Sequence, residues 1–105
     1  MKKICLLLVV VLVVVLFVGC KNDPDATYTI TYLGGADTSG FPPVDSNKYK
    51  SGEEATVLGH GTLLKTGYEF LNWNTNSDGT GESYSKDDKI TINGAVFLYA
   101  IWVKQ

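Results

Sequence analysis

Residues 67–75 read GYEFLNWNT and place three aromatic side chains around an abrupt change of hydrophobic period. Tyr68 and Phe70 alternate as the inward residues of a strand do, whereas Trp73 continues the alternation in the opposite phase. One extra residue in a strand turns the following side chains to the other face, so the pattern predicts a β-bulge or bend. Asn72 suits that bend because asparagine tolerates positive φ better than most residues. We therefore expect the folded domain to be built around this strand.

The N-terminus has the pattern of a targeting segment. The chain has 105 residues, a formal charge of −2 and two cysteines, which allow at most one small domain behind that segment. Lys2 and Lys3 supply a positive start, and residues 4–18 form an unbroken apolar run. Because a membrane-spanning helix needs about 20 apolar residues, the run fits the apolar region of a signal peptide over residues 1–19.

Residues 16–20, LFVGC, resemble the bacterial lipoprotein signal. The resemblance implies that a lipid is attached to Cys20 before cleavage in front of it, which leaves a short tether over residues 20–27. The chain would then lie at the cell membrane or outer membrane, lipid-anchored and extracytoplasmic. Phe17 stands where that family usually has Leu, Val or Ile, so an uncleaved signal anchor is the alternative.

The charge and cysteine content exclude some partners and cross-links. Cleavage removes two of the nine basic residues, leaving seven lysines against eleven acidic residues, and the chain has no arginine. Nucleic-acid binding requires clustered basic residues, so no nucleic-acid partner is expected. Cys5 lies in the apolar run and Cys20 would be acylated, so packing has to stabilise the domain. The predicted structural core consists of Tyr68, Phe70, Trp73, Tyr99 and Trp102.

Local patterns predict an α+β fold that is mostly β with one short helix. Strands are expected over residues 28–32, 54–59, from residue 68 onward and over 89–92. Asp45 is placed to N-cap a short helix over residues 46–51, with Gly52 just after its end. Residues 96–103, VFLYAIWV, are apolar throughout, which favours an interior strand covered on both faces.

A set of spaced residues carries a family resemblance along residues 28–102. These are Pro43-Val44-Asp45, Tyr49 with Gly52, Gly67-Tyr68 with Phe70 and Trp73, Asp78-Gly79 with Gly81, Tyr84, and Leu98-Tyr99-Ala100 with Trp102. In this order and spacing they resemble the Listeria/Bacteroides repeat, also called the internalin B-repeat. The resemblance implies a β-grasp-like extracellular module with a small mixed sheet, here over residues 28–104.

Three departures from the family qualify what the resemblance implies. Asn72 stands where the family typically has glycine. Ile101 replaces a usually polar residue, which adds an apolar contact surface. The family occurs as repeats on long surface proteins, in spacer or adhesion roles, whereas this sequence holds one copy, which weakens transfer of the spacer role.

The polar residues indicate no catalytic or metal site. His60 lies between two glycines, as at a turn tip, and has no second His or Cys donor for a transition metal. Residues 74–85 imitate a calcium loop, but Ser85 stands where a bidentate carboxylate is needed. The acidic pairs at residues 53–54 and 87–88 are adjacent in sequence, so neither forms an acid/base pair. We expect no enzyme, no cofactor and no metal.

Phe41, Pro42 and Pro43 form the candidate partner contact. The prolines stiffen the backbone around an aromatic side chain that no strand or helix pattern requires. The alternative is that Phe41 folds back as a lid on the sheet. The sequence as a whole predicts a lipid-anchored binding or adhesion module, with the membrane and a surface protein or glycan as partners. A purely structural cell-envelope element, or a protein held by an uncleaved signal anchor, is the alternative.

Overall fold

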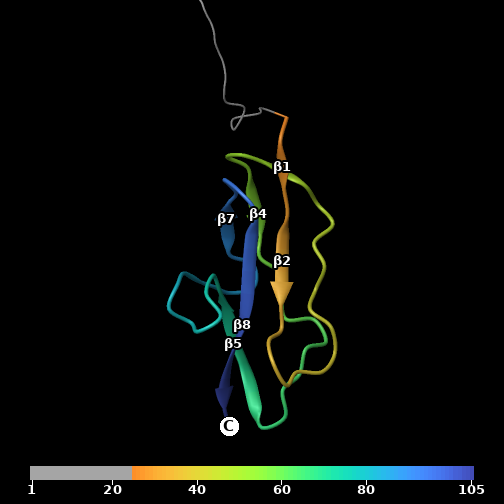
Figure 1. The fold of residues 1–105 in the computed structure, drawn as a ribbon, viewed down its shortest axis with the longest axis vertical. Coiled ribbons are helices and arrows are strands. Elements are labelled where there is room, and N and C mark those ends of the chain that lie inside the picture. The colour runs from red at the N-terminus through yellow and green to blue at the C-terminus, as the bar shows by residue number, and fades with distance from the viewer. Residues whose placement is uncertain (1–24) are drawn as a thin grey trace, which may run out of the picture.

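The computed structural model describes residues 25–105, and every regular element in this part of the chain is a strand (Figure 1). The strands are β1 (Thr27–Tyr28), β2 (Ile30–Leu33), β3 (Tyr49–Lys50), β4 (Glu54–Thr56), β5 (Tyr68–Asn74), β6 (Ser83–Tyr84), β7 (Lys89–Thr91) and β8 (Val96–Lys104). The predicted strands are present, but the predicted helix is absent. The described domain is therefore all-β, and the α+β assignment is wrong.

The residues expected to form the helix, 46–51, make an extended connection instead. The Asp45 carboxylate accepts a hydrogen bond from the backbone N–H of Asn47 at 2.9 Å, which closes a local turn and does not start a helix. Tyr49 then pairs with Tyr28 across β1 and β3. A helix of less than two turns is unstable by itself, so this strand pairing prevails over the weak capping signal.

The main sheet has four strands in the order β2-β8-β5-β6. β8 runs parallel to β2 and antiparallel to β5. The strands of this sheet that come first and last in the sequence, β2 and β8, are therefore neighbours. The long run of β-branched and aromatic residues in β8 explains why it forms the longest strand. Two short pairs, β1-β3 and β4-β7, complete the fold.

The predicted bulge in the central strand is confirmed. Phe70 pairs with Trp102 and Asn72 pairs with Ile101, so Leu71 is the extra residue. The positive φ for which Asn72 seemed suited is not adopted. Among the described non-glycine residues only Asp37 and Asp87 have positive φ. The bulge lets Phe70 and Trp73 face the same core, where their rings meet edge to face at 5.1 Å.

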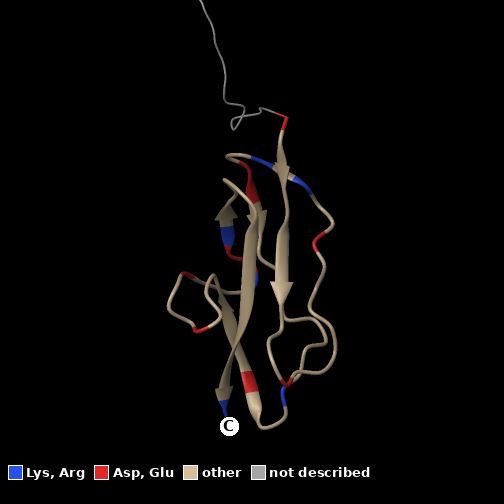
Figure 2. Ribbon diagram, in the orientation of Figure 1, with Lys and Arg blue, Asp and Glu red and all other residues tan. Residues whose placement is uncertain are grey.

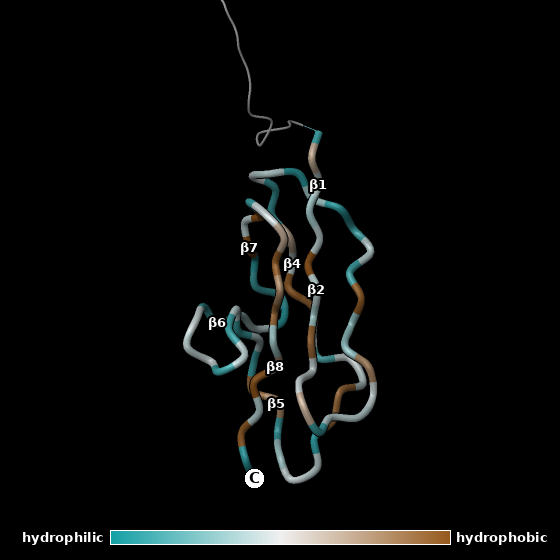
Figure 3. Tube along the Cα trace, viewed as in Figure 1, coloured by the Kyte–Doolittle hydropathy of each residue, from teal (hydrophilic) through white to brown (hydrophobic). Residues whose placement is uncertain are grey.

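The core lies between one face of the four-stranded sheet and a second layer, which β4, β7 and residues 57–63 provide. Figure 3 shows hydrophobic stretches along β2, β4, β7 and β8 that meet here. The buried hydrophobic residues are Ile30, Tyr32, Ala55, Val57, Leu63, Trp73, Ile90, Ile92, Leu98 and Ala100. Trp73 is completely buried, and its indole N–H donates to the Leu58 carbonyl at 2.9 Å.

The expectation that β8 is covered on both faces is wrong. Burial alternates along the strand, with Leu98 and Ala100 buried and Phe97 and Val103 exposed. The second layer covers only the face that holds Leu98. In this domain the apolar run of residues 96–103 therefore forms a strand with one face open to solvent.

Candidate binding surfaces

The open face of the sheet carries an apolar row, which we call the outer stripe: Phe97, Tyr99, Ile101 and Val103 of β8. Phe97 is 49% exposed, Val103 is also exposed, and the other two are half-buried. The exposed bulge residue Leu71 adds to the apolar surface of β5. Contiguous exposed apolar residues are uncommon on monomeric proteins and often mark contact sites.

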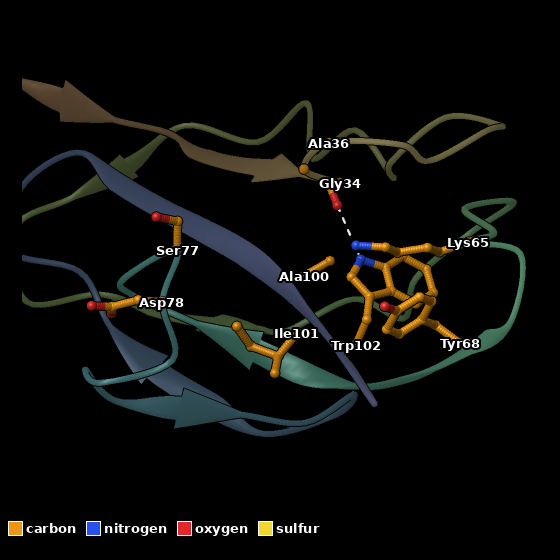
Figure 4. A pocket seen from close by; sticks show the side chains of 10 residues that line it. Gly34, Ala36, Lys65, Tyr68, Ser77, Asp78, Ala100, Ile101 and Trp102 are labelled. Carbon is orange, nitrogen blue, oxygen red and sulfur yellow. Dashed lines mark hydrogen bonds between the residues drawn. The ribbon is translucent and has the colours of Figure 1, made fainter. Parts of the chain in front are cut away.

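A trough of about 310 Å³ crosses the sheet beside β8. β2 ends at Leu33, which pairs with Tyr99, so β8 continues past its neighbour from Ala100 onward. Figure 4 shows Ile101 between two groups of lining residues. The trough is lined by Gly34, Gly35, Ala36, Lys65, Tyr68, Ser77, Asp78, Ala100, Ile101 and Trp102.

Aromatic residues close one end of the trough. The Trp102 indole N–H donates to the Gly34 carbonyl at 3.1 Å, which ties the end of β8 to the turn after β2 (Figure 4). Tyr68 is 37% exposed, and the Lys65 ammonium lies 4.7 Å from the centre of its ring. Of the residues predicted to form the core, Trp73 is buried, Phe70, Tyr99 and Trp102 are half-buried, and Tyr68 lies at this rim.

The loop that imitated a calcium site is held by a buried amide. Asn74 is 1% exposed, and its side-chain nitrogen donates to the carbonyls of Gly79 and Gly81, both at 3.3 Å. Its side-chain oxygen accepts from the backbone N–H groups of Asn76 and Gly81, both at 2.9 Å. Both hydrogen bonds of the oxygen are thus made within the loop. The network holds the loop in place, and Ser77 and Asp78 of this loop line the trough.

The carboxylates of Asp78 and Asp88 accept hydrogen bonds within turns. Asp78 accepts from the Thr80 hydroxyl at 2.7 Å and from its backbone N–H at 3.1 Å, and these bonds hold the pKa of Asp78 below its usual value. Asp88 accepts from the backbone of Ser85 in a similar way. No group of three His, Cys, Asp or Glu residues suited to a metal lies within residues 25–105.

His60 does not project from a turn tip as the flanking glycines suggested. Its ring is half-buried and stacks on Phe70, with centroids 4.8 Å apart and an interplanar angle of 19°. The lysines of the described part lie at several separate places in the fold, with acidic residues between them (Figure 2). That distribution does not resemble a phosphate-binding surface.

The candidate contact loop projects into solvent. Phe41 is 79% exposed and Val44 is 84% exposed, so Phe41 does not form a lid on the sheet. The Thr62 hydroxyl accepts from the Phe41 backbone N–H at 3.0 Å, and Ser39 exchanges two backbone hydrogen bonds with Leu64. These bonds fix the loop while its apolar side chains stay exposed. Val44 directly follows the two prolines but was not among the predicted contact residues.

A groove separates this loop from β2. It has a volume of about 290 Å³ and is lined by residues 29–32 and 42–45. We call it the β2 groove. Pro42 and Pro43 form part of its outer wall, so two of the three predicted contact residues line a real depression.

Cys20 and the predicted signal peptide lie outside the described residues. Within residues 25–105, no helix is long and apolar enough to cross a bilayer.

Comparison with known proteins identifies a family match and two related proteins. Residues 28–101 match the Listeria-Bacteroides repeat domain. A protein of Evansella cellulosilytica named "Putative membrane protein" is 34% identical over 76 residues, which cover 71% of this chain and 11% of that protein. A "Putative Gly-rich membrane protein" of the same organism is 37% identical over 77 residues, which cover 71% of this chain and 9% of that protein. The chain thus spans about a tenth of the length of these curated relatives. No solved structure matches the chain.

Proposed function

Because the chain belongs to the Listeria-Bacteroides repeat domain family, we propose that its domain is a non-catalytic binding module on the extracytoplasmic side of a membrane. The outer stripe is the observation that carries this proposal. Its four apolar side chains lie on the sheet face opposite the core, where Phe97 and Val103 are exposed and Tyr99 and Ile101 are half-buried. Apolar side chains of this kind, on the rigid backbone of a strand, lose little conformational freedom when a partner binds.

We propose that a lipid on Cys20 holds the domain at the membrane. The sequence LFVGC over residues 16–20 supports this anchor, and the names of the two relatives are consistent with a membrane location. Two or more acyl chains give stable anchoring where one is marginal, since each buried CH₂ contributes about 0.8 kcal/mol. Mass spectrometry of the membrane fraction should find Cys20 as a lipid-modified N-terminus. A chain that still begins at Met1 would instead support the signal anchor.

The absence of catalysis is part of the proposal, and the described polar groups support it. The ring of His60 is stacked against Phe70, and the carboxylate of Asp78 is bound to Thr80. General acid/base catalysis needs a titratable group within hydrogen-bond reach of a substrate and a partner that tunes it. The trough places Asp78 and Lys65 in different lining groups and offers no such pair (Figure 4).

A structural role in the cell envelope is the second candidate. The relatives are about ten times longer than the matched segment, which suits a unit within a long surface protein. A structural unit needs no partner at the outer stripe, so the two functions predict different results for the same variant.

The deciding experiment compares two substitutions in the full chain expressed in its membrane. Phe97→Ser removes an aromatic from the outer stripe, and Leu64→Ser removes an exposed apolar side chain elsewhere. We expect Phe97→Ser to lose a cross-linked partner that wild type and Leu64→Ser retain. Retention of every cross-linked species by Phe97→Ser would support the structural role and contradict the binding role of the stripe.

A further inference from the structure

One edge of β2 has no neighbouring strand among the described residues. The backbone oxygen of Thr29, just before β2, accepts a hydrogen bond from the Val96 N–H at 3.1 Å. The backbone carbonyl of Thr29 therefore points toward β8. Backbone groups alternate in direction along a strand, so those of Ile30 and Tyr32 point to the opposite side. Tyr28, two residues earlier, points to that side too, because it pairs with Tyr49 of β3.

No described residue pairs with the backbone of Ile30 or Tyr32 on that side. β2 is the terminal strand of its sheet, and no hydrogen bond joins these two residues to the neighbouring loop within residues 25–105. Both residues are only 3% exposed, and both line the β2 groove. Nearly buried amide and carbonyl groups require a hydrogen-bonding partner, so this edge calls for one.

The loop opposite β2 is built so that it does not fill this edge. Pro42 and Pro43 have no backbone N–H to donate, and the loop beyond them stays clear of the strand. The pairing of β1 with β3 holds the end of the loop beside the chain that leads into β2. The bridge between Ser39 and Leu64 fixes the loop after it has passed the end of β2. The space between the loop and the strand is therefore held open.

The side chains around the groove specify what could enter it. Val44 and the two prolines give an apolar wall, and residues 29–32 supply the strand edge. Asp45 is the charged residue of the lining and is half-buried. It accepts hydrogen bonds from Asn47 and from the Tyr49 hydroxyl, but no lysine of the described residues pairs with it.

The net charge of the domain also favours a basic partner. Residues 25–105 contain six lysines against ten aspartates and glutamates, a net charge of −4 with His60 neutral (6 − 10 = −4). An incoming cation would meet the half-buried carboxylate of Asp45 within a negative domain, and electrostatic complementarity of this kind favours basic partners.

We propose that the β2 groove binds an extended, apolar peptide segment of a partner protein, with a lysine or arginine near Asp45, as an added strand on β2. Main-chain hydrogen bonds to Ile30 and Tyr32 provide affinity, and the apolar wall and the carboxylate provide selection. This inference deepens the proposed binding function and rests on it, but it uses a different surface from the outer stripe.

The first comparison uses synthetic peptides and the wild-type full chain in nanodiscs, so it does not depend on the folding of a variant. The first peptide, VTVKVT, is extended, apolar at alternate positions and carries one lysine. The second, VTVEVT, differs only in the sign of that charge. The third is VTVKVT with alternate backbone amides N-methylated, which removes the donors needed for strand pairing.

We expect VTVKVT to slow hydrogen exchange at the Ile30 and Tyr32 amides and to bind about two- to fivefold more tightly than VTVEVT, as for a partly exposed ion pair. The N-methylated peptide should lose binding. An Asp45→Asn chain should bind both charged peptides equally, whereas Asp78→Asn, with its carboxylate in the trough, should keep the preference.

Three outcomes would overturn the inference. The first is equal binding of VTVKVT and VTVEVT to wild type. The second is a peptide footprint on Phe97 and Ile101 of the outer stripe. The third is protection of Ile30 and Tyr32 that rises with protein concentration in the absence of peptide, which would identify a second copy of this chain as the occupant. A failure here leaves the stripe-dependent cross-link of Phe97 intact, whereas failure of the proposed function removes that cross-link as well.

Discussion

Replacing Trp73 with alanine tests the packing on which the fold depends. The indole is completely buried, and its ring lies 4.8 Å from that of Tyr32 and 5.1 Å from that of Phe70. Emptying so large an aromatic site costs about 3 to 5 kcal/mol. The substitution also leaves the Leu58 carbonyl without its donor, at a cost of about 1 to 3 kcal/mol where the group stays dry.

These costs approach the whole stability of a small domain, which begins at about 5 kcal/mol. With a urea m-value of about 1 kcal/mol per molar, Trp73→Ala should lower the urea midpoint by about 3 M or more. Trp73→Phe retains a ring but loses the donor, so its shift should be about 1 to 3 M. Trp102 is half-buried, and its replacement should cost less than that of Trp73.

Urea unfolding followed by fluorescence of the remaining tryptophan provides the assay. Phe97→Ala, a truncation on the exposed stripe, is the control and should move the midpoint by about 0.5 M or less. If Trp73→Ala unfolds within that same interval of wild type, the assignment of Trp73 to the centre of the core is incorrect.

Four further predictions follow from single contacts. Gly81→Ala should speed hydrogen exchange across the loop held by Asn74, because a Cβ there collides with the Thr75 hydroxyl; unchanged exchange would show that the loop is not so tightly held. The pKa of Asp78 is lowered in the folded state, so its contribution to stability is present above its unfolded pKa and lost as pH falls through the folded one; acid titration of Asp78→Asn should lack this component. Burial raises the pKa of Tyr32, so its contribution is complete below its unfolded pKa and lost as pH rises through the folded one; absorbance titration should place this phenol above free tyrosine. Phe41→Ser should leave the thermal midpoint nearly unchanged, since the side chain is exposed, and a large fall would restore the lid interpretation.

The sequence was most informative where a local pattern had only one structural solution. The phase slip after Phe70 predicted a bulge, because a strand can restore an inward Trp73 only by gaining a residue. The identity of the extra residue was not predictable from the pattern. Asn72 was favoured for its tolerance of positive φ, but the bulge at Leu71 forms without it.

The predicted helix does not form because its local capping residues compete with strand pairing to a segment distant in the sequence. Asp45 and Gly52 have the identities of helix caps, yet Tyr49 gains a partner in Tyr28 that a local pattern does not reveal. The hydroxyl of Tyr49 also donates to Asp45 at 2.7 Å, which uses the carboxylate that was to cap the helix.

The open sheet face was missed for a related reason. Residues 96–103 are apolar on both faces, and hydrophobic period cannot distinguish a doubly covered strand from one whose outer residues await a partner. Ile101 carried the available signal, because it replaces a usually polar residue of the family and lies in the trough. The β2 groove depends on pairing between distant segments, which the sequence did not specify.

Site-specific photo-cross-linking from the outer stripe tests the proposed binding role most directly. A benzophenone amino acid would replace Phe97 in one full-length chain and Leu64 in another, both expressed in the native envelope. The binding role predicts a discrete adduct from residue 97 and none of the same mass from residue 64. Identical adducts from both residues, or no adduct from residue 97, would contradict it.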